Sequence, residues 1–159
     1  MLNSTESDLP RAAARKHQLV ELDSLMLAVP QDRVTTIVSW SEPAPLPFAP
    51  KSVLGIVCIE GRMFTVINAG LLLNAPSNGG SAEKGLLIAL TGDEQLALAV
   101  DKDDGVIEVT ADAINAPTSS TPSLISGILE NEGRQILILD VDQLFPSAIR
   151  GRERRRRRT

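Results

Sequence analysis

The chain is poor in the side chains that carry most enzymatic chemistry and most base stacking: its 159 residues include one cysteine, one histidine, one tryptophan, three phenylalanines and no tyrosine. Cys58 has no second thiol to pair with, which excludes an internal disulfide and fits a reducing cytoplasm. His17 is the only imidazole, so zinc sites built on histidine and Ser-His-Asp or Cys-His catalysis lack their parts. With so few aromatic residues, the core must consist of Val, Ile, Leu and Ala, and nucleic-acid binding by the folded part is disfavoured.

Segments that would direct the chain into or across a membrane are also lacking. Residues 1–18 are polar and of mixed charge, without the apolar stretch of about 7–15 residues that a signal peptide needs. No run approaches the roughly 18 apolar residues of a membrane span. We therefore expect a cytoplasmic protein in which residues 1–18 form a flexible N-terminal arm that carries His17. Cys58 lies within an apolar run, and we expect it to be a buried, inert thiol.

Carboxylates are the remaining candidates for chemistry. Asp101, Asp103 and Asp104 lie close together in the sequence, and a hard cation could use their oxygens. The alternating ligand spacing of a calcium loop is missing, however, so a solvated acidic turn is the better interpretation. Residues 74–85 hold a glycine pair and a lysine, but not the G-x-x-x-x-G-K-[ST] spacing that holds phosphate. We expect no catalytic residue, no metal and no cofactor, and we interpret the protein as a non-enzyme.

What the sequence does contain is an internal repeat. Residues 55–73 (GIVCIEGRMFTVINAGLLL) and 127–145 (GILENEGRQILILDVDQLF) match without a gap at an offset of 72 residues. The same offset continues upstream, where it pairs Pro50 with Pro122, Val34 with Val106 and Ile37 with Val109. The chain is therefore two copies of one unit, joined through residues 74–85.

Each unit has the pattern of a small β structure. An apolar run, a short V-x-x-[IV] strand and a Pro-rich connection lead to a hairpin with a Glu-Gly-Arg turn. Gly61 and Gly133 can take the positive φ that such a tight turn demands. Asn68 and Asp140 end the return strands and are placed to cap a short helix. A unit of roughly 70 residues has a marginal core alone, so we interpret each unit as a small barrel that shares apolar surface with the other.

Charge is distributed unevenly along the chain. Residues 150–158 (RGRERRRRR) hold seven basic residues and one acid, whereas the rest of the chain carries nine basic and nineteen acidic residues. A block of like charges cannot pack, so we expect residues 147–159 to form a disordered tail. Its functional alternatives are an anionic membrane, nucleic acid or an acidic protein face, and a merely solvated tail is equally open. The consecutive arginines are Arg154, Arg155, Arg156, Arg157 and Arg158.

The hairpin with its polar cap, together with a second-half signature, resembles the CheW-like domain family. This family comprises the chemotaxis coupling proteins and the regulatory domain of their histidine kinase. The signature residues are Asp104-Gly105-Val106, Glu108-Val109, Gly127, Gly133 and Asp140. The resemblance runs from about residue 19 to 145. It implies a mostly β fold of two similar SH3-like five-stranded β-barrels packed together with short helices, forming a single domain over residues 19–146 with two subdomains related by the repeat.

The resemblance also implies an adaptor function. Such a protein binds the cytoplasmic tip of a methyl-accepting chemoreceptor and the regulatory domain of a CheA-type histidine kinase, as a scaffold of a chemotaxis-like signalling array. In the family, the receptor helix lies near the V-x-x-I strand and the N-L-R-G hairpin, and the corresponding positions here are Val34, Ile37, Ile59 and Glu60. Glu60 replaces the arginine of that hairpin motif. The alternative is a diverged β-barrel binding module without kinase coupling, whose basic tail binds membrane, nucleic acid or an acidic partner.

Overall fold

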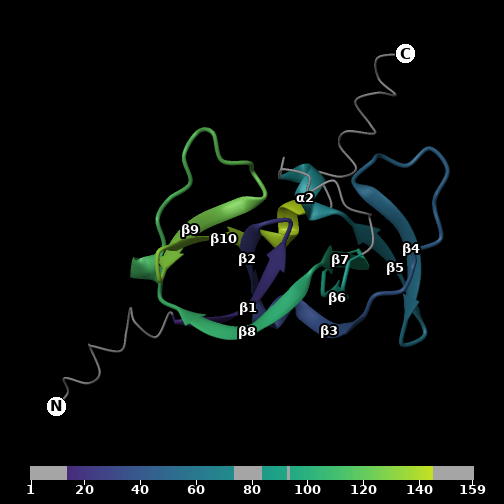
Figure 1. Cartoon of the computed structure of the whole chain (residues 1–159), viewed down its shortest axis with the longest axis horizontal. Coiled ribbons are helices and arrows are strands. Elements are labelled where there is room, and N and C mark those ends of the chain that lie inside the picture. Colours follow the sequence, from purple (N-terminus) through teal and green to yellow (C-terminus); the bar gives the residue numbers. More distant parts are fainter. Residues whose placement is uncertain (1–13, 74–83, 93, 145–159) are drawn as a thin grey trace.

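A computed structural model of the chain describes residues 14–73, 84–92 and 94–144 (Figure 1). The expected tail over residues 147–159, with its five consecutive arginines, lies outside the described residues. So do most of the expected N-terminal arm and most of the joint between the two copies.

The described residues form two five-stranded sheets, called sheet A and sheet B below. Sheet A consists, from edge to edge, of β8 (Lys102–Val109), β1 (Arg15–Leu22), β2 (Leu25–Pro30), β10 (Arg134–Leu139) and β9 (Ile125–Asn131). Sheet B consists of β3 (Val34–Ser39), β6 (Leu86–Leu90), β7 (Leu96–Val100), β5 (Arg62–Ile67) and β4 (Val53–Ile59). Neighbouring strands are antiparallel except for β2 with β10 and β5 with β7, which are parallel.

The repeat is visible in the structure, but one copy of the repeat does not correspond to one sheet. If each strand of sheet B is replaced by the equivalent strand of the other copy, the strand order of sheet A results. Each sheet nevertheless takes three strands from one copy and a two-stranded hairpin, β1–β2 or β6–β7, from the other. The interpretation of each copy as one barrel is therefore wrong. The two exchanged hairpins occupy interior positions of their sheets, where they bury apolar side chains on both faces, one face in the core shared by the sheets and the other within their own sheet.

The buried residues form three clusters. One lies within sheet A and includes Met26 and Ala28, and an equivalent cluster lies within sheet B. The third and largest cluster is shared between the sheets and includes Leu27 and Val29. Successive residues of β2 thus point into different clusters, because side chains alternate along a strand. This double burial explains why the hairpin strands have continuous apolar runs instead of an alternating pattern.

Short helical segments connect the strands. They are η1 (Gln31–Arg33), α2 (Ala69–Leu72), η2 (Ala111–Ala113) and a helical turn over residues 141–144. Asn68 caps α2 by accepting a hydrogen bond of 3.0 Å from the amide of Gly70 through Oδ1. Asp140 does the same for the second helical turn, accepting 3.1 Å from the amide of Asp142.

The two long hairpins have matching turns. Gly61 and Gly133 have φ values of 82° and 78°, and the glutamates before them, Glu60 and Glu132, have φ values of 52° and 54°. Two successive residues with positive φ are typical of a type I′ turn, whose twist matches that of the flanking strands. The Glu-Gly pair therefore adopts the same conformation in both copies.

Two expectations about single residues are wrong. His17 does not lie in a flexible arm, because β1 begins at Arg15 and His17 is 4% exposed within it. Cys58 is exposed, because β4 alternates and directs Val57 and Ile59 inward on either side of the thiol. The expected acidic turn is also wrong in part, because Asp103 and Asp104 lie in β8.

Candidate functional site

Val34 and Ile37, expected to contact a receptor, lie on β3 at one edge of sheet B. Both side chains are half-buried and pack against the core shared by the sheets. A β-bulge between Val34 and Thr36 shifts the register with β6. The two side chains are therefore held by the core but keep part of their apolar surface accessible to solvent.

Ile59 and Glu60 lie at the end of β4 and at the tip of its hairpin, on the opposite edge of sheet B. Ile59 is 4% exposed and packs with Phe64 in the cluster inside sheet B. Glu60 is exposed. Of the four residues, Val34, Ile37 and Glu60 are open to a partner, whereas Ile59 supports the hairpin from inside.

The outer face of the β4–β5 hairpin carries an apolar pair that the sequence analysis missed. Cys58 is paired with Met63 across the strands, and the Met63 side chain is 57% exposed. The equivalent pair in the second copy is Glu130 with Gln135, which is polar. Comparison of the two copies position by position is the signal that would have found this difference. The outer face of the first hairpin is therefore apolar where that of the second is solvated.

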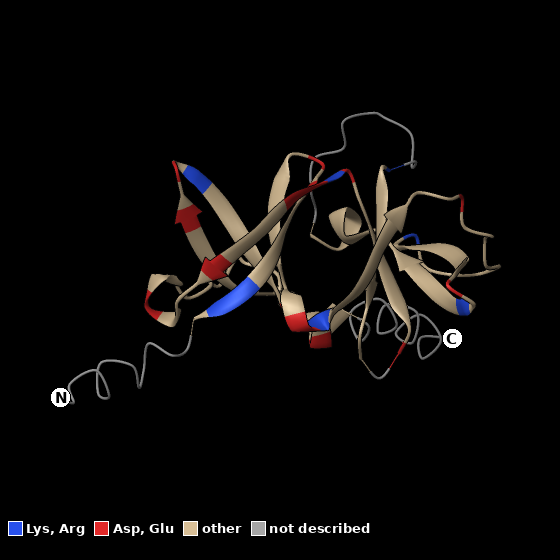
Figure 2. Ribbon diagram, turned by 90° about the horizontal axis from the view of Figure 1, so that it is seen from below, with Lys and Arg blue, Asp and Glu red and all other residues tan. Residues whose placement is uncertain are grey.

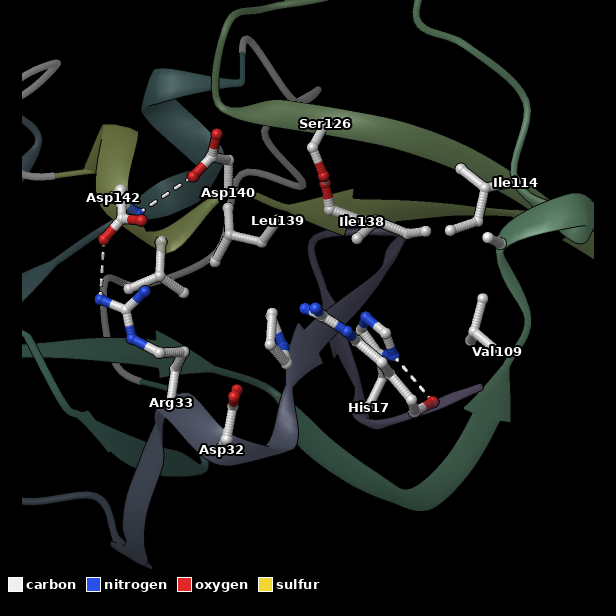
Figure 3. Close-up of a pocket in the computed structure, with 14 residues that line it drawn as sticks. His17, Asp32, Arg33, Val109, Ile114, Ser126, Ile138, Leu139, Asp140 and Asp142 are labelled. Atoms are coloured by element: carbon white, nitrogen blue, oxygen red, sulfur yellow. Dashed lines mark hydrogen bonds and ion pairs between the residues drawn. The ribbon is translucent and has the colours of Figure 1, made fainter. Parts of the chain in front are cut away.

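A cavity of about 520 Å³ opens at one end of sheet A (Figure 3). His17 lines it from β1, and the ion pair between Arg33 and Asp142, with 2.9 Å between Nη2 and Oδ1, spans η1 and the second helical turn. Burial lowers the pKa of His17, and the charge of Arg15 lowers it further, against the opposing effect of a bond from Nδ1 to the Arg15 carbonyl. The charge of Asp32, which lines the same cavity, opposes this lowering of the His17 pKa. Sequence reasoning could not find this cavity, because its walls come from distant segments.

The acidic residues that suggested a cation site have other partners. Lys84, whose side chain is 8% exposed, places Nζ 2.7 Å from Asp23 Oδ1 and 3.6 Å from Asp101 Oδ1. The second Asp101 oxygen accepts a bond of 2.8 Å from the Asp23 amide. Asp103 accepts from the Gly105 amide at 2.8 Å and from the amide group of Gln18. No cluster of three metal-ligating side chains exists in the part of the chain that the structure describes.

Acidic residues are distributed over both sheets, including β8 and the tips of the two long hairpins (Figure 2). None of the described helices is long and apolar enough to cross a membrane. Among the described residues, exposed or half-buried apolar side chains are found at the β3 edge, on the first hairpin and in the loop between β3 and β4.

Comparison with known proteins agrees with this description. The model of the CheW-like domain family matches residues 16–148, which is nearly the whole described part. The chain belongs to the CheW-like domain family. The mostly β fold with two five-stranded sheets and short helices, which the sequence predicted, is thereby confirmed.

Several CheW proteins resemble the chain over most of its length. The chemotaxis protein CheW of Thermotoga maritima is 26% identical over 127 residues, covering 79% of this chain and 83% of that protein. The chemotaxis protein CheW of Rhizobium meliloti is 26% identical over 122 residues, covering 72% and 76%. The scaffolding protein TtCheW of Thermoanaerobacter tengcongensis shares the fold, with a TM-score of 0.74, 20% identity and coverage of 82% and 87%. The CheW family is a non-catalytic scaffold family.

Proposed function

We propose that this CheW-like protein is an adaptor that couples chemoreceptors to a histidine kinase in a chemotaxis-like array. The observation that carries the proposal is the family match over residues 16–148, which includes the strands of both sheets. A scaffold needs at least two partner surfaces on a rigid body. Two sheets that share one buried core, with different side chains at equivalent outer positions, supply such a body.

The receptor surface is proposed to be the β3 edge. A receptor tip is helical, and an amphipathic helix binds by placing its apolar face against an apolar surface. Val34 and Ile37 offer such a surface, and their packing against the shared core fixes their position. Ile59 contributes indirectly, because its burial beside Phe64 holds the hairpin whose tip carries Glu60.

Glu60 is proposed to select the partner by charge. Its carboxylate is exposed at the hairpin tip, where the family resemblance implies an arginine. Close charge pairs across an interface couple by about 1.5–7 kcal/mol. A partner that fits this protein therefore presents a basic or neutral group opposite Glu60, whereas the partner of an ordinary family member presents an acid.

The repeat supplies a matched control for the receptor surface. Val106 is the counterpart of Val34 in the second copy, and it lies on β8 with 49% of its surface exposed. Val34→Asp should abolish binding of the full chain to a receptor cytoplasmic fragment from the same organism, and Val106→Asp should leave it unchanged. Circular dichroism of both variants checks that they are folded. Unchanged receptor binding by Val34→Asp would place the receptor elsewhere.

A further inference from the structure

The loop between β3 and β4 carries a phenylalanine in an unusual place. The Leu46 carbonyl accepts a hydrogen bond of 3.4 Å from the Ala49 amide, which closes a turn with Pro47 and Phe48 at its centre. Phe48 has a φ of 63° and is 93% exposed. Proline followed by a residue with positive φ is typical of a type II turn, in which glycine normally takes the position of Phe48. The fold therefore carries a strained residue whose ring gains nothing from the rest of the molecule.

The turn is nevertheless held firmly. Ala44 and Ile56 exchange two backbone hydrogen bonds of 2.8 Å, which fasten the loop to β4 before the turn. Gly55 permits this close approach, since a Cβ at that position would lie 2.2 Å from the Ala44 carbonyl oxygen. After the turn, the Val53 amide donates a bond of 2.9 Å to the Pro50 carbonyl. The turn is thus presented from a fixed base, in the loop that leads from β3 into β4 (Figure 1).

The second copy shows that the fold does not require an apolar side chain there. Its counterpart turn is closed by a bond of 3.0 Å from the Thr121 amide to the Thr118 carbonyl. Leu46 corresponds to Thr118, and Phe48 corresponds to Ser120, whose hydroxyl lies 3.0 Å from that of Thr118. Ser120 is not among the residues with positive φ in the described chain. One turn is polar and internally bonded, while the other exposes apolar side chains at the same backbone positions.

We propose that Phe48, with Leu46 beside it, is an anchor that enters an apolar pocket of the kinase regulatory domain. The inference rests on the proposed function, because only the proposed function identifies the kinase regulatory domain as a partner. Aromatic side chains that fill a pocket at the centre of an interface carry a large share of binding energy. An anchor that is already fixed in its bound conformation loses less entropy on binding.

The shape of the anchor decides between the two partners of an adaptor. A receptor helix is convex and requires a groove on the adaptor, so a projecting ring does not fit it. A folded domain built like this one can offer a concave site, as the cavity at one end of sheet A illustrates, in which Val109, Ile114 and Ile138 line part of a wall shared with charged side chains. Insertion into a membrane is disfavoured, because interfacial anchors are surrounded by Lys and Arg. The charged residues of this loop are one acid, Glu42, and one lysine, Lys51, whose charges cancel.

The test is the substitution Phe48→Gly in the full chain. Glycine accepts the positive φ of this turn without strain, which offsets the extra conformational freedom that glycine gives the unfolded chain, so the variant should melt at about the same temperature as the wild type. Its affinity for the isolated regulatory domain of the kinase should fall at least tenfold, and its affinity for the receptor cytoplasmic fragment should not change. An equally stable protein that binds less tightly cannot be explained by unfolding. Ser120→Gly, the matched control, should leave both affinities unchanged.

Each result decides a different question. If the wild type binds the kinase domain and Phe48→Gly binds equally well, the anchor is refuted and the adaptor function stands. If the wild type does not bind the kinase domain at all, both the anchor and the kinase side of the proposed function are refuted. If Phe48→Gly instead loses receptor binding, self-association in sedimentation, or binding to anionic phospholipid vesicles, the ring serves that partner and the kinase assignment is overturned.

Discussion

Gly55 offers the sharpest test of how sheet B holds the Pro-rich loop between β3 and β4. In the substitution Gly55→Ala, the new Cβ would lie 2.2 Å from the oxygen and 2.7 Å from the carbon of the Ala44 carbonyl. The two backbone bonds between Ala44 and Ile56 must then lengthen or break. Each such bond contributes about 0.5–1.5 kcal/mol, and the φ of 144° at Gly55 adds strain of about 1 kcal/mol for alanine. We expect the free energy of unfolding to fall by about 2–4 kcal/mol.

Gly61→Ala separates the close approach from the backbone strain. Gly61 also has a positive φ, 82°, but no heavy atom lies within 4 Å of its added Cβ. This control should cost only about 1 kcal/mol of strain. Urea unfolding of both variants, followed by far-ultraviolet circular dichroism, measures the difference. If Gly55→Ala is no more destabilising than Gly61→Ala, the loop is not fastened to β4 as described.

Three further predictions concern the turn, the charge at the hairpin tip and the buried histidine. Gly133→Val should reduce the free energy of unfolding by about 1 kcal/mol or more, because a β-branched residue is strained at a φ of 78°; an unchanged urea midpoint would contradict this. Glu60→Arg should weaken the protein's own receptor complex about tenfold and strengthen binding to the receptor of an ordinary family member; if neither affinity changes, Glu60 is a solvated turn residue. The pKa of His17 is lowered by burial from its ordinary value of 6.5, so the unfolded chain binds more protons below that pH and stability should fall as the pH decreases through 6.5. His17→Gln should show a smaller loss of stability between pH 7.5 and 5.5, and an equal loss would assign the pH dependence to other groups.

Local features of this fold could be predicted because they depend on short-range chemistry. A Glu-Gly pair between apolar runs restricts the backbone to a tight turn wherever it occurs, and Gly61 and Gly133 adopt the same φ range. A polar residue before a helical turn accepts the free amide two residues later, and Asn68 and Asp140 both do so. Neither result depends on which other strands lie nearby.

Long-range features could not be predicted in this way. A repeat shows which segments are alike, but it does not show which copy supplies the neighbour of each strand, so the exchange of β1–β2 and β6–β7 was missed. The same limit applies to the cavity, where His17, Arg33 and Asp142 meet from distant segments. Cys58 is a different case, since the inward-facing Val57 and Ile59 already place it on the outer face of an alternating strand.

The exposure of the candidate site residues could be predicted only in part. Val34, Ile37 and Glu60 are open to a partner, but Ile59 is buried, because the residue before a hairpin tip still follows the alternation of its strand. The exposed Phe48 and Met63 were not predicted. Both stand where the second copy has a polar residue, so comparing the two copies for hydrophobicity rather than for identity would have revealed them.

The central claim is that one chain holds a receptor and a kinase at the same time through separate surfaces. Its most direct test is light scattering on size-exclusion chromatography of the full chain mixed with the receptor cytoplasmic fragment and the kinase regulatory domain. We predict one complex that contains all three components, which loses only the receptor with Val34→Asp and only the kinase domain with Phe48→Gly. Competition between the two partners for the chain, or failure of the chain to bind either of them, would contradict the account.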